Sequence, residues 1–335
     1  AAGGRILLIT LLGAILSASM ELTQYYVVGR DTAATDFYSP TLGTVVGAGI
    51  GVGVGGFFRW LPLRLIAEGR AAVILLGAYL GYALLPFVPT IDLHKYWDAL
   101  KPVFLHPTLT GFDLFRHTAM WLMICALIEE VDGPKRSWLW FPLFAGGVIA
   151  GEVVVISTSV SVARLAGAGL AFCLWLALLA MGVRGRRSIV AAIFLACLVA
   201  VRLAPFRFGA ATGHFGWIPF LAFMQGSMVV NSISFCEKFF LYGSAIWILT
   251  ALGLRLRAAT LLIAALLLGT SWIEIYLPDR SAEITDALMA LLIGGVLGAA
   301  GLGGGKSPLP ARASARSDGA AQGGARVSLK GRGRV

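Results

Sequence analysis

Apolar residues in this chain form long runs, separated by short polar stretches, from about residue 6 to about residue 302. A helix needs about 20 apolar residues to cross the hydrocarbon layer of a bilayer, and most of the runs have about that length. The pattern therefore predicts an all-α polytopic bundle of about ten transmembrane helices. The predicted spans are 6–27, 40–58, 71–88, 113–129, 138–156, 165–183, 188–204, 233–252, 258–275 and 286–302.

The segments between the spans differ in character. Residues 57–70 mix aromatic side chains with arginines and indicate an interfacial segment, and residues 91–101 predict a short amphipathic helix that lies on the membrane. The stretches 129–136 and 184–187 are expected to be charged turns. The tail 303–335 is rich in Gly, Ala and Arg, and this composition predicts disorder.

Composition supports the membrane assignment and fixes an orientation. The chain is 58% hydrophobic and only 13% charged, which excludes a soluble domain with a polar surface. With ten spans, two thirds of the lysines and arginines fall on one face together with the tail. The positive-inside rule makes that face cytoplasmic. The net charge of +10 then lies beside anionic lipid and does not indicate nucleic-acid binding.

One polar motif stands where the first span ends and the second begins. It contains Glu21, Gln24, Arg30 and Asp36, and a related arrangement recurs near residues 271–286. Both copies precede a helix rich in small residues, and both are expected on the extracytoplasmic face. In the second copy the corresponding residues are Ser271, Glu274, Arg280 and Asp286.

Further polar side chains lie near the same predicted membrane depth. Asp113 and His117 share a helical face at a spacing of four, and Lys238 shares a face with Tyr242. Glu152 is predicted at the depth of His117, so these two can converge. A second predicted cluster contains Lys238, Glu274, Arg280 and Asp286. Opposite charges at such a mouth either stabilise one another or shift pKa values enough for proton transfer, and both outcomes stay open.

Several landmarks recur at nearly one spacing. The separations are 119 residues from Pro86 to Pro205, 121 from His117 to Lys238, and 122 from Glu152 to Glu274. They predict a diverged repeat of about 120 residues with four helices in each unit. The predicted organisation is a rear half unit over 1–70, full units over 71–187 and 188–302, and the tail over 303–335.

These motifs resemble the VanZ-like family of bacterial membrane proteins. Glu21, Gln24, Arg30, Asp36 and Gly43 match the family pattern most fully. Lys238, Glu274, Arg280 and Asp286 match with substitutions, and His117 and Glu152 match in part. The family's namesake is associated with low-level resistance to the glycopeptide teicoplanin. The resemblance therefore implies a role in the cell envelope and the bacterial cytoplasmic membrane, with no named reaction.

Three functional hypotheses follow. The first is an outward-facing charged cluster that binds a membrane lipid or an anionic lipid-linked or cell-wall intermediate. Its candidate catalytic residues are Glu21, Glu274, Lys238 and His117, and its candidate ligand-binding residues are Gln24, Arg30, Asp36, Asp113, Glu152, Tyr242, Arg280 and Asp286. The alternatives are a structural scaffold without catalysis and a small-solute transporter.

The sequence predicts neither a metal site nor a cofactor. No two of His94, His106, His117 and His214 have the helical spacing of metal ligands. Phosphate-binding glycine loops and nucleophilic Ser or Cys motifs are also missing. The four cysteines lie in or near predicted spans and are expected to be packing residues.

Overall fold

The structure is a computed structural model. It describes residues 69–302 except 106, 135, 157, 210–214, 222, 224–226 and 278–281, together with residues 7, 10, 11, 13–15, 18, 19, 41 and 44. The predicted site residues Glu21, Gln24, Arg30, Asp36 and Arg280 lie outside the described residues. The same holds for most of the first two predicted spans, for the segment 57–68 and for the tail.

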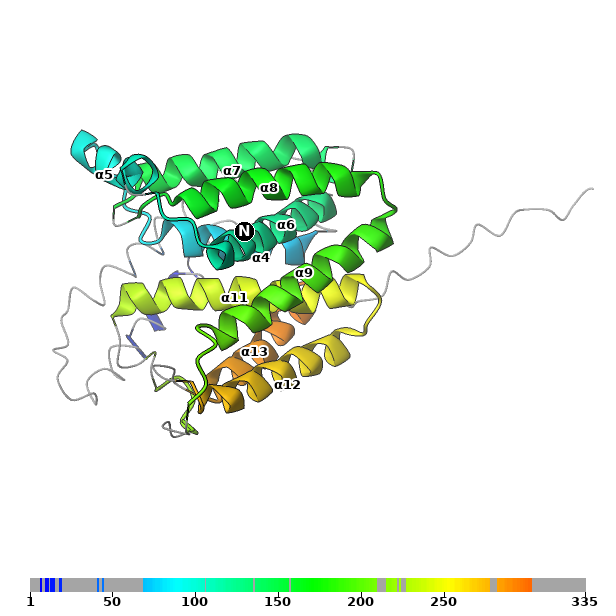
Figure 1. Cartoon of the computed structure of the whole chain (residues 1–335). Helices are drawn as coiled ribbons and strands as arrows, with labels where there is room; N and C mark the ends of the chain where they lie inside the picture. The colour runs from blue at the N-terminus through cyan, green and yellow to red at the C-terminus, as the bar shows by residue number, and fades with distance from the viewer. Residues whose placement is uncertain are drawn as a thin grey trace, which may run out of the picture.

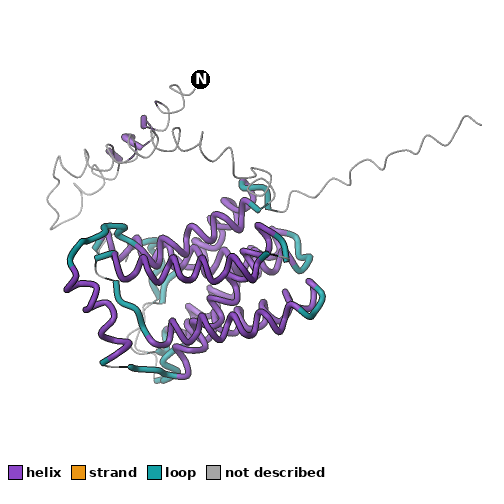
Figure 2. The backbone as a smooth tube through the Cα atoms, turned by 90° about the horizontal axis from the view of Figure 1, so that it is seen from above, coloured by secondary structure: helices purple, strands orange, loops and turns teal. Residues whose placement is uncertain are grey.

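Helices make up about three quarters of the described residues, which contain isolated bridges but no strand (Figure 2). The all-α prediction is therefore confirmed. The helices are α4 (Arg70–Leu84), α5 (Leu93–Phe104), α6 (Gly111–Asp132), α7 (Ser137–Val154), α8 (Val162–Leu179), α9 (Val183–Leu203), α11 (Met228–Ala251), α12 (Leu256–Glu274) and α13 (Thr285–Ala299). Among these, α6, α7, α8 and α12 are long and apolar enough to cross a membrane.

Two predicted charged turns are wrong in part. Helix α6 continues to Asp132, so Glu129 and Glu130 are helical, and α9 already begins at Val183, so Arg186 and Arg187 are helical as well. The apolar runs alone therefore predict helices that are too short at these ends. The charged residues continue the helices because they pair across the α6–α9 contact, as described below.

Local capping explains where α6 starts and stops. The Thr110 hydroxyl accepts the Asp113 backbone N–H at 3.0 Å and donates to Asp113 Oδ2 at 2.6 Å. This N-cap satisfies the Asp113 backbone N–H, which has no partner inside the helix, and the second bond joins the two side chains. Gly133 follows the last residue with φ of 83°, a conformation that glycine adopts without a steric penalty. Asp113, predicted as a ligand-binding residue, thus serves as a capping residue in the structure.

The bundle divides along the chain into a front half, α4–α8, and a rear half, α9–α13 (Figure 1). The two halves pack against each other through two pairs of helices. Helix α4 of the front half contacts α11, and α9 of the rear half contacts α6. Helices α6 and α11 are consequently surrounded by protein over much of their length, with continuous buried stretches at 119–128 and 240–249. A helix that is apolar on all sides is expected in such a central position.

Aromatic rings connect the four central helices. Tyr79 of α4 lies 5.3 Å from Trp121 of α6 and 5.1 Å from Phe240 of α11, and Phe240 lies 6.2 Å from Phe194 of α9, all between ring centroids. All four side chains are nearly inaccessible to solvent. Buried rings at these separations contribute both apolar burial and favourable edge contacts, so they hold the two halves together.

The same backbone conformation follows α4 and α9. Phe87 and Phe206 have φ of 58° and 60°, and their N–H groups donate to Leu84 O at 2.7 Å and Leu203 O at 2.9 Å. A few residues later the chain bonds to the last residue of α7 in the front half and to a residue just beyond α12 in the rear half. These bonds are Thr90 N–H to Val154 O and Gly209 N–H to Tyr276 O, both at 3.0 Å.

Several ion pairs cross between the halves, and one of them joins α6 to α11. Arg116 of α6 pairs with Glu237 of α11, and about a quarter of each side chain is exposed. We expect Arg116→Glu and Glu237→Arg each to lower the thermal midpoint because each single change places like charges together. The double reversal should recover about 0.5–3 kcal/mol, the usual range of coupling between contacting residues.

Thermal unfolding of the four proteins in detergent measures this coupling. Arg255→Glu, at the start of α12, is the matched control for a charge change without this partner. Additive effects in the double variant would show that the pair does not join the halves.

Candidate functional site

Five polar side chains meet at the end of the rear half where α9 and α12 stop and α13 starts. Arg202 of α9 donates to Glu274 Oε2 at 2.9 Å and to Ser271 Oγ at 2.7 Å, both from α12, and it also pairs with Asp286 of α13. Lys238 Nζ of α11 lies 2.7 Å from Asp286 Oδ1. We call Arg202, Lys238, Ser271, Glu274 and Asp286 the rear cluster.

The rear cluster is buried and electrically balanced. Ser271, Glu274 and Asp286 are buried, and Arg202 exposes 11% of its side chain. Two cations face two carboxylates, which offsets the cost of removing each charge from water. Lys238 is the exception in burial: its side chain is 28% exposed, and its ammonium lies 5.3 Å from the centre of the Phe223 ring.

The start of α13 and the loop before α11 fix the position of Asp286. Asp286 lies in the first helical turn, where the helix dipole favours a negative charge. The neighbouring Thr285 hydroxyl accepts the Phe220 N–H at 3.0 Å, and the Gly216 N–H donates to Ala282 O at 2.7 Å. These bonds attach the loop to the beginning of α13.

The front half holds a smaller group of charges. Glu152, at the end of α7, is fully buried and pairs with Arg164 of α8, which we call the front pair. Lys95 of α5 donates to Thr158 O at 2.7 Å and to the Glu152 carbonyl oxygen at 3.4 Å. The partner of Glu152 in the structure is therefore Arg164, whereas the sequence suggested His117.

His117 instead packs closely against α8. A Cβ atom placed on Gly167 would lie 2.7 Å from His117 Cβ, so glycine is required for this approach. Tyr242 is buried beside Asp286 at the rear cluster. The structure thus brings Lys238, Tyr242, Glu274 and Asp286 together and leaves His117 and Asp113 apart from them.

Arginines were the main omission of the sequence reasoning. Arg116, Arg164 and Arg202 each provide the cation of an ion pair, and none was predicted as a site residue. A signal was present, because Arg116 and Arg202 fall inside predicted spans. An arginine within an apolar span requires an acidic or carbonyl partner.

A further group of ion pairs lies at the other end of α6. Glu129 Oε2 lies 2.6 Å from Arg186 of α9, and both side chains are almost completely buried. The Arg186 guanidinium lies 5.2 Å from the centre of the Trp175 ring. Beside this pair, Arg187 of α9 binds Glu130 of α6. Helix α9 is therefore attached by ion pairs near both of its ends.

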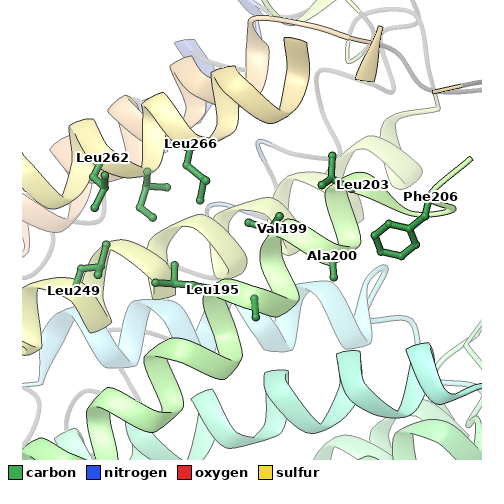
Figure 3. A pocket seen from close by; sticks show the side chains of 10 residues that line it. Leu195, Val199, Ala200, Leu203, Phe206, Leu249, Leu262 and Leu266 are labelled. Atoms are coloured by element: carbon green, nitrogen blue, oxygen red, sulfur yellow. The ribbon is translucent and has the colours of Figure 1, made fainter. Parts of the chain in front are cut away.

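An apolar groove of about 630 Å³ adjoins the rear cluster (Figure 3). Helix α9 forms one wall with residues such as Val199 and Leu203, α12 forms the other, and Phe206 lies at one end. The lining residues are Leu195, Ala196, Val199, Ala200, Leu203, Phe206, Leu249, Leu262, Ile263 and Leu266. Leu203 directly follows Arg202, so the groove and the cluster share the end of α9.

The arrangement limits the chemistry that these residues can perform. Glu152, Glu274 and Asp286 each already hold a cationic partner from another helix. The described residues hold no group of three His, Cys, Asp or Glu side chains that could bind a metal ion. The geometry therefore favours binding and electrostatic stabilisation over proton transfer.

Comparisons with protein-family models, with curated proteins and with solved structures find no match for this chain.

The front pair is more deeply buried than the pair Arg187–Glu130, so we expect its loss to cost more stability. We expect Glu152→Gln to destabilise the protein by about 3–5 kcal/mol, because it leaves Arg164 buried without its counter-charge. Glu130→Gln should cost about 0–1 kcal/mol, since 32% of the Glu130 side chain is exposed. Thermal or denaturant unfolding in detergent measures both.

The double variant Glu152→Gln/Arg164→Met provides the internal control. It removes both charges and should be more stable than Glu152→Gln alone. Equal losses in the single and double variants would mean that the charge of Arg164 is not the source of the cost.

Proposed function

We propose that this chain is an integral membrane protein of the bacterial cell envelope that binds an anionic lipid or lipid-linked intermediate at the rear cluster and the adjoining groove. The main support is that a charged site and an apolar groove adjoin. Arg202, a member of the cluster, directly precedes Leu203, which lines the groove. A ligand with a negative head and a hydrocarbon chain matches this combination. Neither a free anion nor a neutral hydrocarbon would use both parts.

The groove supports the lipid part of the proposal. All ten lining residues are apolar, and half of the Leu262 and Phe206 side chains is exposed. In a bilayer, a groove between α9 and α12 opens toward hydrocarbon, so a lipid chain enters it without crossing water. The chain would gain contacts with both helices that it lacks in bulk lipid.

The cluster supports the anionic part. Lys238 has three N–H donors, and its partly exposed side chain leaves room for an acceptor besides Asp286. Arg202 Nε is buried and has no hydrogen-bond partner among the described residues. A phosphate oxygen at this rim would accept a charge-assisted hydrogen bond from the exposed Lys238 ammonium.

Topology and repeats belong to the same proposal. The rear cluster lies on the extracytoplasmic side, and the tail 303–335 is cytoplasmic, as the distribution of basic residues indicates. The front and rear halves are diverged four-helix units. The matching conformations at Phe87 and Phe206 and the matching bonds of Thr90 and Gly209 support this repeat. The resemblance to VanZ-like proteins supports the role in the envelope.

A structural scaffold is the second candidate, and one observation favours it. In the rear cluster and the front pair, every carboxylate already has a cation, so the charges can serve only to fix helix positions. Under that hypothesis Lys238 matters for stability and does not matter for lipid selectivity.

Lipid binding to the purified protein separates the two candidates. We expect native mass spectrometry to show tighter retention of phosphatidylglycerol than of phosphatidylcholine. Lys238→Gln should weaken phosphatidylglycerol binding by about tenfold, since a hydrogen bond to a charged group contributes about 1.5–3 kcal/mol. It should weaken phosphatidylcholine binding less, because the choline cation already offsets the charge of that lipid's phosphate.

Two further variants make the test specific. Ala200→Trp, which fills the groove, should weaken binding of both lipids. Arg255→Gln removes a cation from the opposite end of α12 and should change neither. Equal retention of the two lipids by the parent protein, or an unchanged preference in Lys238→Gln, would contradict the proposal and favour the scaffold.

A further inference from the structure

Helix α5 has three distinct faces, although it has only twelve residues. At helical spacing, Lys95, Ala99 and Pro102 share the first face, which packs toward α7 and the segment before α8. Ala99 is buried, its carbonyl accepts the Val160 N–H at 3.0 Å, and Lys95 donates to Thr158 O. This face fixes α5 against the front half.

The second face is apolar and exposed. Leu93, Trp97 and Phe104 follow one another at spacings of four and seven and expose 78%, 48% and 65% of their area. The Trp97 and Phe104 rings are nearly parallel, with centroids 6.3 Å apart. Single exposed apolar residues are common on protein surfaces, but three large ones in one line form a contiguous patch.

The third face is charged. Asp98 lies 2.5 Å from Lys101 and 3.8 Å from His94, so these three residues form one exposed row. The hydrogen bond from Lys101 holds the pKa of the Asp98 carboxyl below its usual value. The Asp98 carboxylate therefore stays charged at neutral pH, and this polar row belongs in water.

We propose that α5 lies in the headgroup layer of the bilayer, with Leu93, Trp97 and Phe104 inserted among lipid chains and the row His94–Asp98–Lys101 in water. Only a boundary between hydrocarbon and water satisfies two adjacent faces of such different polarity. Trp97 fits this position because tryptophan concentrates at membrane interfaces.

The apolar face continues a surface that already belongs to the membrane-spanning part. Val88 and Ile156 are exposed apolar residues joined by the Ile156 N–H to Val88 O bond of 3.0 Å. They connect the end of α7, which is long and apolar enough to span a membrane, with Ile91 at the start of α5. A lipid surface that surrounds α7 therefore extends to α5 without interruption.

Spin labels on the two exposed faces test this placement. In a variant with the four cysteines replaced by alanine, single cysteines at positions 93, 97 and 104, or at 94, 98 and 101, are labelled in phosphatidylglycerol–phosphatidylcholine vesicles. We expect the first set to collide mainly with oxygen, which concentrates in hydrocarbon, and the second set mainly with a water-soluble nickel complex.

Each other outcome overturns the proposal. Labels at 93, 97 and 104 that are shielded from both reagents would indicate a protein cover, either another segment of this chain or a second copy. Labels accessible to nickel would place the face in water. If the variant without cysteines does not fold, quenching by brominated lipid decides, because Trp97→Phe should remove a quenched component of the emission.

Discussion

A charge buried between apolar helices needs an opposite charge within reach, and this requirement organises the described part of the bundle. Leaving one such carboxylate or guanidinium alone costs several kcal/mol, a large share of the total stability of a domain. Glu129, Glu152, Glu274 and Asp286 are all buried, and each meets an arginine from another helix. The arginines thus determine which helix ends must come together, while apolar packing fills the space between them.

The two halves meet this requirement with different residues. Glu152 and Glu274 occupy comparable positions near the ends of α7 and α12, and both are buried. The cation for Glu152 is Arg164 at the start of α8, whereas Glu274 receives Arg202 from the end of α9. At the start of α13, where α8 has its arginine, the rear half has Asp286, and Lys238 supplies the additional cation. Both halves balance each buried carboxylate with a cation, although the cations come from different positions. The presence of an opposite charge therefore matters more for these helix ends than the residue that supplies it.

The lengths of the apolar runs predicted most of the helices in the part of the chain that the structure describes, because a run of about 20 apolar residues is typical of a helix long enough to cross hydrocarbon. The predicted spans 138–156 and 258–275 differ by at most two residues from α7 and α12. Counting crossings also predicted that Lys238, Glu274 and Asp286 approach one another. Arg164 and Arg202 could not be assigned to partners in this way, since the choice between neighbouring helices depends on packing that no single segment encodes. The close packing of His117 against α8 at Gly167 likewise depends on a contact between two helices that no single segment encodes.

The attachment of α9 at both ends bears on the transporter hypothesis. Near one end Arg186 is bound to Glu129 of α6 in the other half, and near the other end Arg202 is bound to Glu274 and Asp286 of its own half. Alternating access requires one half to rock against the other, and such a motion would separate one of these buried pairs. Breaking a buried pair costs about 3–5 kcal/mol unless a new partner replaces it, and the aromatic contact of Tyr79 in the front half with Phe240 in the rear half resists the same motion. A bundle fastened in this way is better suited to hold a ligand at a fixed rim than to carry it across the membrane.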